Sequence, residues 1–355
     1  MKITDYSCRR LTMRLKKPIR VALGEISCGD TVLLRLDTDT GLSGYGEGSG
    51  VPFVTGEDCG DVLSGVEKLA EAAIGRSPFE PGAIHAAMDA AFTGRSAAKA
   101  AIDMALYDLM ARAAGLPLYR FLGGSCPAVE TDKTITLAAP REMAAEAAEL
   151  ARRGFRHIKI KAGEDPETDI EAVRLIREAA GPEVELKLDA NQGWDVRTTQ
   201  RVMRALGDCG ISALEQPLPA ADLCGMSRLR GTLGLPLMAD ESCFGPGDAA
   251  NILRCGAADL INIKLMKSGG LYKARRINAV AEAFGAACML GCMTESRIGI
   301  SAAASLAAAE RNIRWADLDS AMFFEDSREI SGGCVYDGAW IRLSEEPGLG
   351  VSIEF

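Results

Sequence analysis

The stretch His157-Ile158-Lys159-Ile160-Lys161-Ala162-Gly163 decides the fold that we expect for this chain. Its apolar and polar residues alternate and it ends on glycine, which is typical of a strand that runs into a loop. Side chains on a strand alternate between its two faces, so Lys159 and Lys161 point to the same side. Two cations on one side indicate either an edge strand with both lysines in water or a polar site inside the protein.

Further strand-like runs follow this stretch at a regular interval. The spacing is 28 residues from Lys161 to Asp189, then 26 to Glu215, 25 to Asp240 and 24 to Lys264, and each of these residues ends one run. A strand–helix unit that repeats in this way predicts a parallel sheet with helical crossovers. The segments that read as helices between the runs include Pro166–Ala180, Val196–Leu206, Gly247–Arg254 and Leu271–Phe284.

The number of strands predicts how the sheet closes. Glu130–Leu137 reads as the first strand, and runs that end near Cys292 and Asp317 complete a set of eight. Eight such units form a (β/α)8-type barrel of the α/β class, whose active site lies at the carboxyl ends of the strands. Because the polar residues sit at those ends, we expect them to form the site.

The regions on either side of the predicted barrel have a different character. Residues 1–125 predict an α+β capping domain, residues 126–320 the catalytic barrel, and residues 321–355 a segment that packs back on the cap. Two loops of the cap, Lys17–Glu25 and Gly46–Glu57, are expected to form a lid that excludes water from the chemistry. The cap is predicted to contain strands over Lys2–Leu15, Thr31–Asp37 and Gly41–Glu47 and a helix over Ser96–Ala114.

Composition narrows the class of protein. The 355 residues are 48% hydrophobic and 25% charged, which is ordinary for a globular enzyme, and the net charge of −9 disfavours nucleic acid or an anionic membrane as a partner. Eleven cysteines without a CxxC pair indicate reduced thiols rather than disulfides or a zinc site. No stretch approaches the roughly 20 apolar residues of a membrane span, and the first residues lack the apolar core of a signal peptide. We expect a cytoplasmic homo-oligomer that acts on a small molecule.

Three carboxylates are expected to meet at adjacent strand ends, those of Asp189, Glu215 and Asp240. They would repel each other unless a cation joined them. Oxygen ligands without histidine or cysteine suit Mg²⁺, with Mn²⁺ as a substitute. Asn191 and Glu241 are expected to orient these ligands. Any one of the acids could instead cap a helix or lie on the surface, but three at matching positions favour a metal site.

Lys161 and Lys264 lie on either side of these carboxylates and face each other across an eight-stranded ring. An amine is a base only when it is neutral, and we expect the positive charge of Lys159 and of a metal to favour that form. One lysine on each face permits racemisation or epimerisation through an enediolate. The histidines, His85 and His157, occupy no late strand end, and His157 is interpreted as structural. A Schiff-base aldolase and a non-enzymatic metal-binding barrel are the alternatives from other classes.

These residues occur in motifs that resemble a known family. The motifs are KIKAG, LDAN, LEQP, MADES, NIKLMKSGG and GCMTES, with AAIDMALYDLMARAAGLPLYRFLGG in the cap. Over nearly the whole chain they resemble the muconate-lactonising subgroup of the enolase superfamily, in whose sites lysine bases act with Mg²⁺. The resemblance implies a modified barrel, an acid/base pair of Lys161 and Lys264, and Lys159 as an electrostatic helper near the substrate carboxylate. It also implies Mg²⁺ ligation by Asp189, Glu215 and Asp240.

The end of the eighth strand narrows the choice among the reactions of this subgroup. Asp317 and Asp319 lie two residues apart, on one face, where a substrate ammonium would satisfy them and the anions muconate and o-succinylbenzoate would be repelled. They resemble the DxD signature of dipeptide epimerases, such as the L-Ala-D/L-Glu epimerases, in which the pair holds the amino terminus of the dipeptide. Thr134 matches a substrate-contacting position of that family. The alternatives within the subgroup are N-acylamino acid racemase, o-succinylbenzoate synthase and muconate cycloisomerase.

The first lid loop indicates which side chain the inverted residue of the substrate carries. The resemblance implies an arginine near Leu23 or Gly24 for a glutamate side chain, and this chain has no cation there. A carboxylate would be desolvated in that place without a partner. Gly24 leaves room, and Phe53 and Met293 are expected to contact the substrate.

The two lid loops together predict the order of preference. Glu25 and Glu57 offer partners for a lysine or arginine side chain. We expect a hydrophobic C-terminal residue to be preferred, a cationic one to come second and glutamate last. The apolar wall is expected to comprise Ile19, Leu23, Val51, Pro52 and Phe53.

Overall fold

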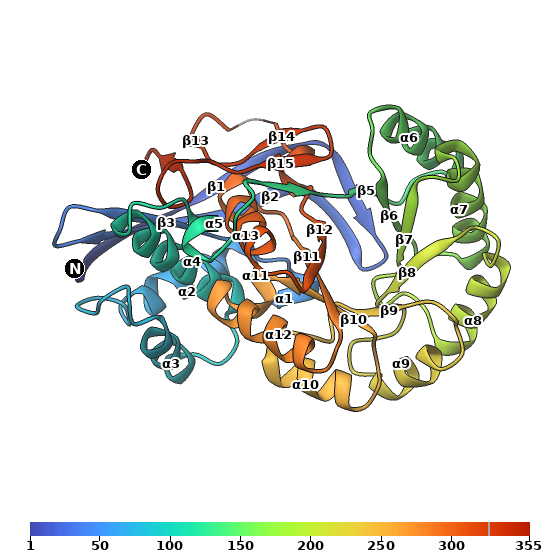
Figure 1. The fold of residues 1–355 in the computed structure, drawn as a ribbon, viewed down its shortest axis with the longest axis horizontal. Helices are drawn as coiled ribbons and strands as arrows, with labels where there is room; N and C mark the ends of the chain where they lie inside the picture. Colours follow the sequence, from blue (N-terminus) through green and yellow to red (C-terminus); the bar gives the residue numbers. More distant parts are fainter. Residues whose placement is uncertain (326) are drawn as a thin grey trace.

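The structure is a computed structural model that describes residues 1–325 and 327–355. Its two halves lie side by side, an antiparallel sheet with its helices and a ring of eight parallel strands covered by helices (Figure 1). The predicted (β/α)8-type barrel with an α+β cap is confirmed. Within the described ranges, no helix combines the length and the apolar character that crossing a membrane requires.

One long hairpin dominates the sheet of the cap. Leu11, Met13 and Leu15 of its first strand are buried between exposed residues, and the pairing continues to Val21 and Gly24. The segment that was expected to be a loop, Lys17–Glu25, is therefore the closed end of the hairpin. This end reaches the barrel, where the amide of Leu137 donates to the carbonyl oxygen of Arg20 at 3.0 Å. The three antiparallel strands are β1 (Ile3–Val21), β2 (Gly24–Thr38) and β3 (Ser43–Gly48).

Helix α4 is the buried centre of the cap. It is buried from Ala97 to Ala111 and ends one residue before the predicted helix Ser96–Ala114. A Cβ atom at Gly46 of β3 would clash with the carbonyl oxygen of Ala101, so only glycine permits the close approach of the strand to the helix. The helices of the cap are α1 (Pro52–Thr55), α2 (Cys59–Ala70), α3 (Pro81–Ala91), α4 (Ser96–Ala113) and α5 (Leu118–Phe121).

The barrel strands follow one another in chain order around the sheet. Lys161 pairs with Asp189, and Asp189 pairs with Glu215, so the polar residues at neighbouring strand ends lie at one level. The strands are β5 (Lys133–Ile135), β6 (His157–Lys161), β7 (Glu185–Asp189), β8 (Ile211–Glu215), β9 (Leu237–Ala239), β10 (Leu260–Lys264), β11 (Ala287–Gly291) and β12 (Ile313–Asp317).

The expected first strand is divided in two. The sequence predicts one strand over Glu130–Leu137, whereas the structure has β4 (Ala128–Glu130) and then the separate strand β5. This prediction is wrong in extent because β4 pairs antiparallel with β15 (Trp340–Arg342), outside the barrel. Between the two strands, the amide of Asp132 donates to the carbonyl oxygen of Ala316 at 3.0 Å and joins β12 to the first strand of the barrel.

Helices cover the outside of the barrel (Figure 1). Helix α7 has the predicted bounds, and the three other predicted barrel helices differ by one residue at one end. The helices are α6 (Pro140–Arg152), α7 (Pro166–Ala180), α8 (Val196–Ala205), α9 (Leu223–Arg230), α10 (Pro246–Arg254), α11 (Leu265–Ser268), α12 (Leu271–Ala283), α13 (Arg297–Ala309) and the 3₁₀ turn η1 (Ser320–Phe323). A small apolar cluster inside the barrel comprises Ala213, Met238, Leu260, Ala287, Met289 and Trp315.

The C-terminal residues lie against the cap. Arg112 of α4 donates to the carbonyl oxygen of Val351 at 2.8 Å, and the amide of Leu349 donates to Asp108 at 2.6 Å. The strands of this segment are β13 (Ile330–Gly332), paired with β16 (Val351–Ile353), and β14 (Val335–Asp337), paired with β15. The domain boundaries at residues 125 and 320 stay predictions.

Two buried carboxylates of the cap hold helices of the barrel. Glu47 of β3 accepts hydrogen bonds from the amides of Ser296 and Gly299, at 2.8 and 2.9 Å, where α13 begins. Asp103 of α4 accepts one from the amide of Leu271, the first residue of α12. Carboxylates are favourable partners for the free N–H groups at helix N-termini, so these contacts fix how the cap sits over the barrel.

Candidate active site

Three carboxylates converge where β7, β8 and β9 end. Asp189 and Glu215 are the last residues of their strands, and Asp240 directly follows β9. One carboxylate oxygen of each lies within 4.8 Å of the other two, and all three side chains are buried. The structure therefore brings together the three predicted metal ligands, and a set of hard oxygen donors of this kind fits Mg²⁺.

Lysine ammonium groups balance part of the charge of this triad. Glu215 Oε2 and Asp240 Oδ1 are buried and lie 2.9 Å from Lys159 and 2.6 Å from Lys267, respectively, in ion pairs. Burial and the nearby aspartate charges raise the pKa of Glu215 to about 7. Burial also opposes ionisation of Asp240, but Lys264 and Lys267 outweigh it and hold the pKa of Asp240 far below its usual value.

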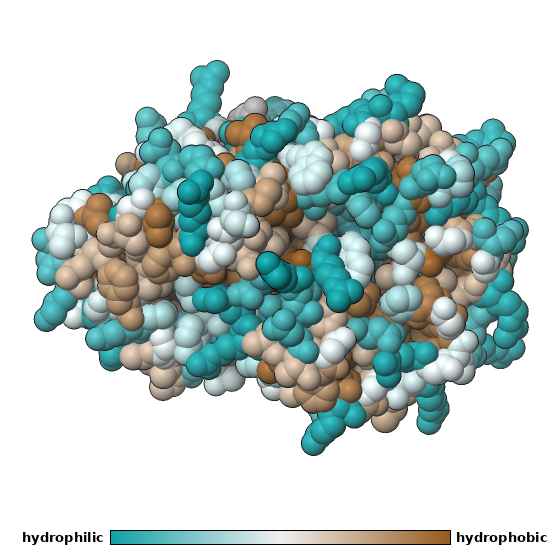
Figure 2. Space-filling view, in the orientation of Figure 1, coloured by the Kyte–Doolittle hydropathy of each residue, from teal (hydrophilic) through white to brown (hydrophobic). Residues whose placement is uncertain are grey.

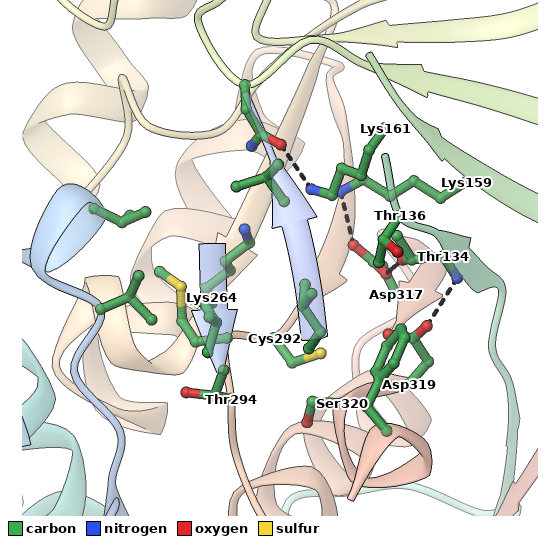
Figure 3. A pocket seen from close by; sticks show the side chains of 18 of the residues that line it. Thr134, Thr136, Lys159, Lys161, Lys264, Cys292, Thr294, Asp317, Asp319 and Ser320 are labelled. Carbon is green, nitrogen blue, oxygen red and sulfur yellow. Dashed lines mark hydrogen bonds and ion pairs between the residues drawn. The ribbon is translucent and has the colours of Figure 1, made fainter. Parts of the chain in front are cut away.

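Lys161 and Lys264 enter the site from β6 and β10, which are four positions apart in the eight-stranded sheet (Figure 3). The Lys161 ammonium lies 2.7 Å from Asp189 and 2.9 Å from Asn191. The Lys264 ammonium lies 2.8 Å from Asp240. The two amines thus approach the triad from strands on opposite sides of the ring, as the sequence predicts.

The charges around Lys264 act on its pKa in opposite directions. Burial lowers the pKa of Lys264. The negative charges nearby, above all that of Asp240, raise this pKa by more, so the net shift is upward. Without a metal, the carboxylate of Asp240 at 2.8 Å stabilises the ammonium form of Lys264, and the expected preference for the neutral amine beside a bound metal stays a prediction.

Lys159 lies deepest among the lysines of the site and is 1% exposed. Its ammonium donates to Asp317 at 2.8 Å and lies 2.9 Å from both Asp189 and Glu215. It therefore connects the triad to Asp317 at the end of β12 and supplies a positive charge on the polar side of the cavity.

Asp317 and Asp319 lie beside Thr134, on the side of the cavity formed by β5 and β12 (Figure 3). The Thr134 hydroxyl donates to Asp317 Oδ1 at 3.3 Å, and the Thr134 amide donates to Asp319 Oδ2 at 2.8 Å. Burial opposes ionisation of Asp317, but the charges of Lys159 and Lys161 hold its pKa well below the usual range. Asp319 also forms an ion pair with Lys133, which the sequence analysis did not single out.

One cavity lies at the mouth of the barrel, with about 670 Å³ of space free of protein atoms, part of it open to solvent. We call the barrel side of the cavity the polar floor and the cap side the apolar wall. Met293 lines the cavity as expected, and Phe323, Thr136 and Ser320 line it without having been predicted. The polar floor comprises Thr134, Lys159, Lys161, Asn191, Glu241, Lys264, Asp317 and Asp319. The apolar wall comprises Ile19, Val21, Ile26, Val51, Phe53 and Val54.

The apolar wall contrasts with the outer surface. On the face that Figure 2 shows, hydrophilic side chains are interspersed with apolar ones over both halves of the molecule. A contiguous apolar wall inside a cavity is a typical binding surface for an apolar group. The large apolar side chains exposed elsewhere are Phe79, Leu116, Phe284, Val335, Trp340 and Phe355.

Parts of the predicted lid lie elsewhere. Leu23, Pro52 and Gly24 do not line the cavity, although a Cβ atom at Gly24 would be 3.5 Å from the Phe53 ring. The reason is the register of the hairpin, in which Ile19 pairs with Ile26 and both side chains face inward while Leu23 lies in the turn.

The two acids of the lid do not face the cavity. Glu25 is exposed and lies 3.8 Å from Arg20 in an ion pair. Glu57 is buried and accepts a hydrogen bond from the amide of Ala97 at 3.0 Å, at the start of α4. The expected partners for a cationic substrate side chain are therefore engaged outside the cavity.

Residues that the sequence analysis missed hold the carboxylates in place. Asn262 donates to Glu215 at 2.8 Å, and the side chain of Gln216 accepts from the amide of Asp240 at 2.9 Å. Asn191 donates to Glu241 at 3.0 Å, and its backbone amide donates to Asp189 at 2.9 Å, while the expected role of Asn191 and Glu241 in orienting the ligands stays a prediction. Asn262 lies two residues before Lys264 on β10 and so shares its face, a period-two signal that could have identified it.

The two histidines lie away from the cavity. His157 pairs with Glu185 at 3.2 Å where β6 and β7 begin, at the opposite end of the barrel. His85 of α3 is hydrogen-bonded to Asp103 at 2.7 Å in the interface of the cap with α12. Both positions agree with structural roles.

Two family models match this sequence. Residues 4–123 match the mandelate racemase/muconate lactonizing enzyme N-terminal domain, and residues 142–354 match the enolase C-terminal domain-like family. The hydrophobic dipeptide epimerase of Enterococcus faecalis is 42% identical, over 99% of this chain and 100% of that protein.

Solved structures resemble this chain over its whole length. The dipeptide epimerase of Enterococcus faecalis, complexed with Mg and L-Leu-L-Tyr, has a TM-score of 0.97 and 43% identity over 99% of this chain and 100% of that one. A substrate-liganded complex of the L-Ala-D/L-Glu epimerase of Bacillus subtilis has a TM-score of 0.96 and 40% identity over 99% of both chains. Those relatives therefore bind ligands on the fold described above.

Proposed function

This chain belongs to the mandelate racemase/muconate lactonizing enzyme family of the enolase superfamily, and from that premise we propose that it epimerises dipeptides. The reaction inverts the α-carbon of the C-terminal residue by a 1,1-proton transfer. The observation that carries the proposal is the placement of Lys161 and Lys264 on opposite sides of a buried carboxylate triad, with Asp317 and Asp319 in the same cavity.

The triad supports Mg²⁺ as the cofactor, with Mn²⁺ as a substitute. Asp189, Glu215 and Asp240 would hold the cation through one oxygen or more each. When bound, it stabilises negative charge that develops on the substrate carboxylate as the α-proton leaves. Asn262 fixes Glu215, and Gln216 fixes the backbone of Asp240, so that the ligands keep their positions.

The two lysines perform the proton transfer. One amine, in its neutral form, takes the α-proton and the C–H bond on that face breaks. The other, as an ammonium, gives a proton to the opposite face, and the new C–H bond has the inverted configuration. Because the roles exchange in the reverse direction, Lys161 and Lys264 together interconvert the L,L and L,D dipeptides. Lys159 adds a fixed positive charge near the substrate carboxylate.

The ends of the substrate are recognised by different parts of the cavity. Asp317 and Asp319 offer carboxylate oxygens to the ammonium of the N-terminal residue. The apolar wall faces the side chain of the C-terminal residue, and among the described residues the cations that line the cavity are Lys159, Lys161 and Lys264, all on the polar floor. A glutamate side chain against the apolar wall would lose its hydration without gaining a partner. The proposed preference is therefore for a hydrophobic C-terminal residue, with glutamate and cationic residues both disfavoured, because Glu25 and Glu57 do not line the cavity.

A comparison of four substrates tests the proposal. We expect kcat/KM to be highest for L-Ala-L-Leu and L-Ala-L-Phe and lower for both L-Ala-L-Lys and L-Ala-L-Glu in the presence of Mg²⁺. If L-Ala-L-Glu is the best substrate, the assignment of the apolar wall is wrong. If no dipeptide is epimerised but an N-acylamino acid is racemised, the reaction is that of the alternative racemase. Borohydride should trap no substrate on the protein, because trapping would indicate a Schiff-base aldolase.

A further inference from the structure

Asp317, the last residue of β12, and Asp319, two residues beyond it, differ in how many of their carboxylate oxygens accept hydrogen bonds from the protein. Asp317 uses both, since Oδ1 accepts from the Thr134 hydroxyl and Oδ2 from Lys159. Asp319 uses one, since the Lys133 ammonium at 2.9 Å and the Thr134 amide at 2.8 Å both donate to Oδ2. Within residues 1–325 and 327–355, no donor is found for Asp319 Oδ1, and Asp319 lines the cavity. Oδ1 is therefore the acceptor that stays available to a ligand.

Lys133 reaches Asp319 from behind the cavity. Lys133 and Thr134 are neighbours on β5, so their side chains leave the strand on opposite faces. Thr134 lines the cavity and Lys133 does not. The Lys133 ammonium also lies 3.0 Å from the centroid of the Phe323 ring, a cation–π contact with a residue that does line the cavity. Lys133 is thus 8% exposed and held between Asp319 and Phe323.

We propose that Lys133 is a positioning residue for recognition of the substrate's amino terminus. By holding Oδ2, it turns Oδ1 of Asp319 toward the cavity, where Oδ1 accepts a hydrogen bond from the ammonium of the dipeptide. The inference rests on the proposed dipeptide epimerase function and assigns the contact to one oxygen of one aspartate. It follows that Lys133 affects substrates with a free α-amino group and leaves the proton transfer at the other end of the substrate unchanged.

The expected change follows from the local charges. Lys133→Met keeps an unbranched side chain against Phe323 but removes the charge and the donor. A buried carboxylate that loses its ion-pair partner no longer has a fixed orientation, and the Thr134 amide alone holds Oδ2. The recognition of the ammonium then weakens, although Asp319 is still present.

The test compares two substrates that differ only in the amino group, L-Ala-L-Leu and N-propionyl-L-leucine. The measured quantity is the ratio of their kcat/KM values. In Lys133→Met we expect this ratio to fall about tenfold or more, through a higher KM for L-Ala-L-Leu, while the value for N-propionyl-L-leucine stays within about threefold; a tenfold loss corresponds to 1.4 kcal/mol. Lys133→Arg, which keeps a charged donor, should retain more of the ratio than the Met variant.

A matched control and a second variant keep the test decisive. Lys99→Met removes a buried lysine of α4 in the cap, which pairs with Asp89 and does not line the cavity, and should leave the ratio unchanged whatever its effect on stability. Lys133→Gln serves if the Met variant does not fold, and its ratio should also fall. An unchanged ratio in either Lys133 variant overturns the inference. Failure of the wild-type protein to epimerise any dipeptide would instead overturn the proposed function.

Discussion

The polar floor and the apolar wall of the cavity differ in how their side chains are held. On the floor, Lys159 has three carboxylates within 2.9 Å, and Lys264 lies 2.8 Å from Asp240. On the wall, Ile19, Val51 and Phe53 are placed by the packing of a hairpin and a short helix. A change on the floor therefore disturbs several charged partners, whereas a change on the wall alters mainly the shape and polarity of one surface.

This difference suggests a division of tasks between the two halves of the molecule. The floor residues come from the ends of barrel strands, whose register fixes their relative positions. The wall residues come from the cap, which is attached to the barrel at helix ends through Glu47 and Asp103. Substitutions on the floor should abolish the chemistry, and substitutions on the wall should change which dipeptide is used.

The largest expected effect comes from the metal ligands. Removing Mg²⁺ with EDTA and exhaustive dialysis should abolish epimerisation, and Asp240→Asn should lower kcat by roughly 10²–10³ or more, because an electrostatic stabiliser is lost. Asp248→Asn is the control, since Asp248 caps α10 outside the cavity. Full turnover of dialysed protein in excess EDTA would rule out a metal-dependent mechanism.

The next largest effect is expected for the two lysines. Lys161→Ala and Lys264→Ala should each lower the rate of epimerisation by roughly 10²–10⁴, because each face of the α-carbon loses its acid/base group. Each variant should still exchange the α-proton of one stereoisomer with D₂O through the surviving lysine, as followed by mass spectrometry. Interconversion of L,L and L,D dipeptides at the wild-type rate by either variant would contradict the two-face arrangement.

A substitution on the apolar wall should change the substrate preference of the enzyme without abolishing its activity. Ile26→Arg places a cation in the apolar wall, opposite Ile19. The ratio of kcat/KM for L-Ala-L-Glu over L-Ala-L-Leu should rise by roughly 10- to 200-fold, the range expected for altered contacts in a pocket. Ile26→Leu is the matched control and should keep the wild-type ratio. A variant that loses activity on both substrates equally would show that the wall and the floor are not separable.

The smallest expected effect on activity is that of a residue at the junction between the cap and the barrel, which should change the pH dependence of stability. Burial and the charge of Glu47 raise the pKa of Glu295 to about 8. Glutamate in an unfolded chain has a pKa near 4.3, so between pH 4.3 and 8 the folded protein binds one more proton than the unfolded protein. The free energy of unfolding should therefore fall as pH rises toward 8, by up to about 1.4 kcal/mol per pH unit.

Glu295→Gln cannot ionise and should lose this component of the pH dependence. Its melting temperature relative to wild type should therefore rise between pH 5 and pH 8. The exposed Glu345→Gln is the control and should leave the slope unchanged. Parallel stability curves for wild type and Glu295→Gln would show that Glu295 does not keep its proton in the folded state.

The sequence predicted the barrel and the position of its polar strand ends because both follow from simple periodicities. The spacing of Lys161, Asp189, Glu215 and Asp240 reflects one strand–helix unit each, and the triad forms where this spacing places it. The roles of the individual site residues stay predictions, as do the homo-oligomer and the cytoplasmic location.

Other features depend on contacts that no local pattern contains. The register of the hairpin decides that Ile26 rather than Leu23 faces the cavity. Lys133 lies on the strand face opposite Thr134, and only the length of its side chain and the position of η1 bring its ammonium to Asp319. The first strand was predicted too long because Glu130 pairs with Trp340, more than two hundred residues away in the chain.

Epimerisation of L-Ala-L-Leu in D₂O by the wild-type enzyme tests the central claim, that two lysines act on opposite faces of one carbon. The isotope content of the α-carbon should be measured in substrate and product at low conversion. If Lys161 and Lys264 act as proposed, the L,D product carries deuterium from the start, because the proton it receives comes from the lysine opposite the one that removed the substrate proton. Product that retains the original proton at early times would show transfer by a single base and would contradict the account.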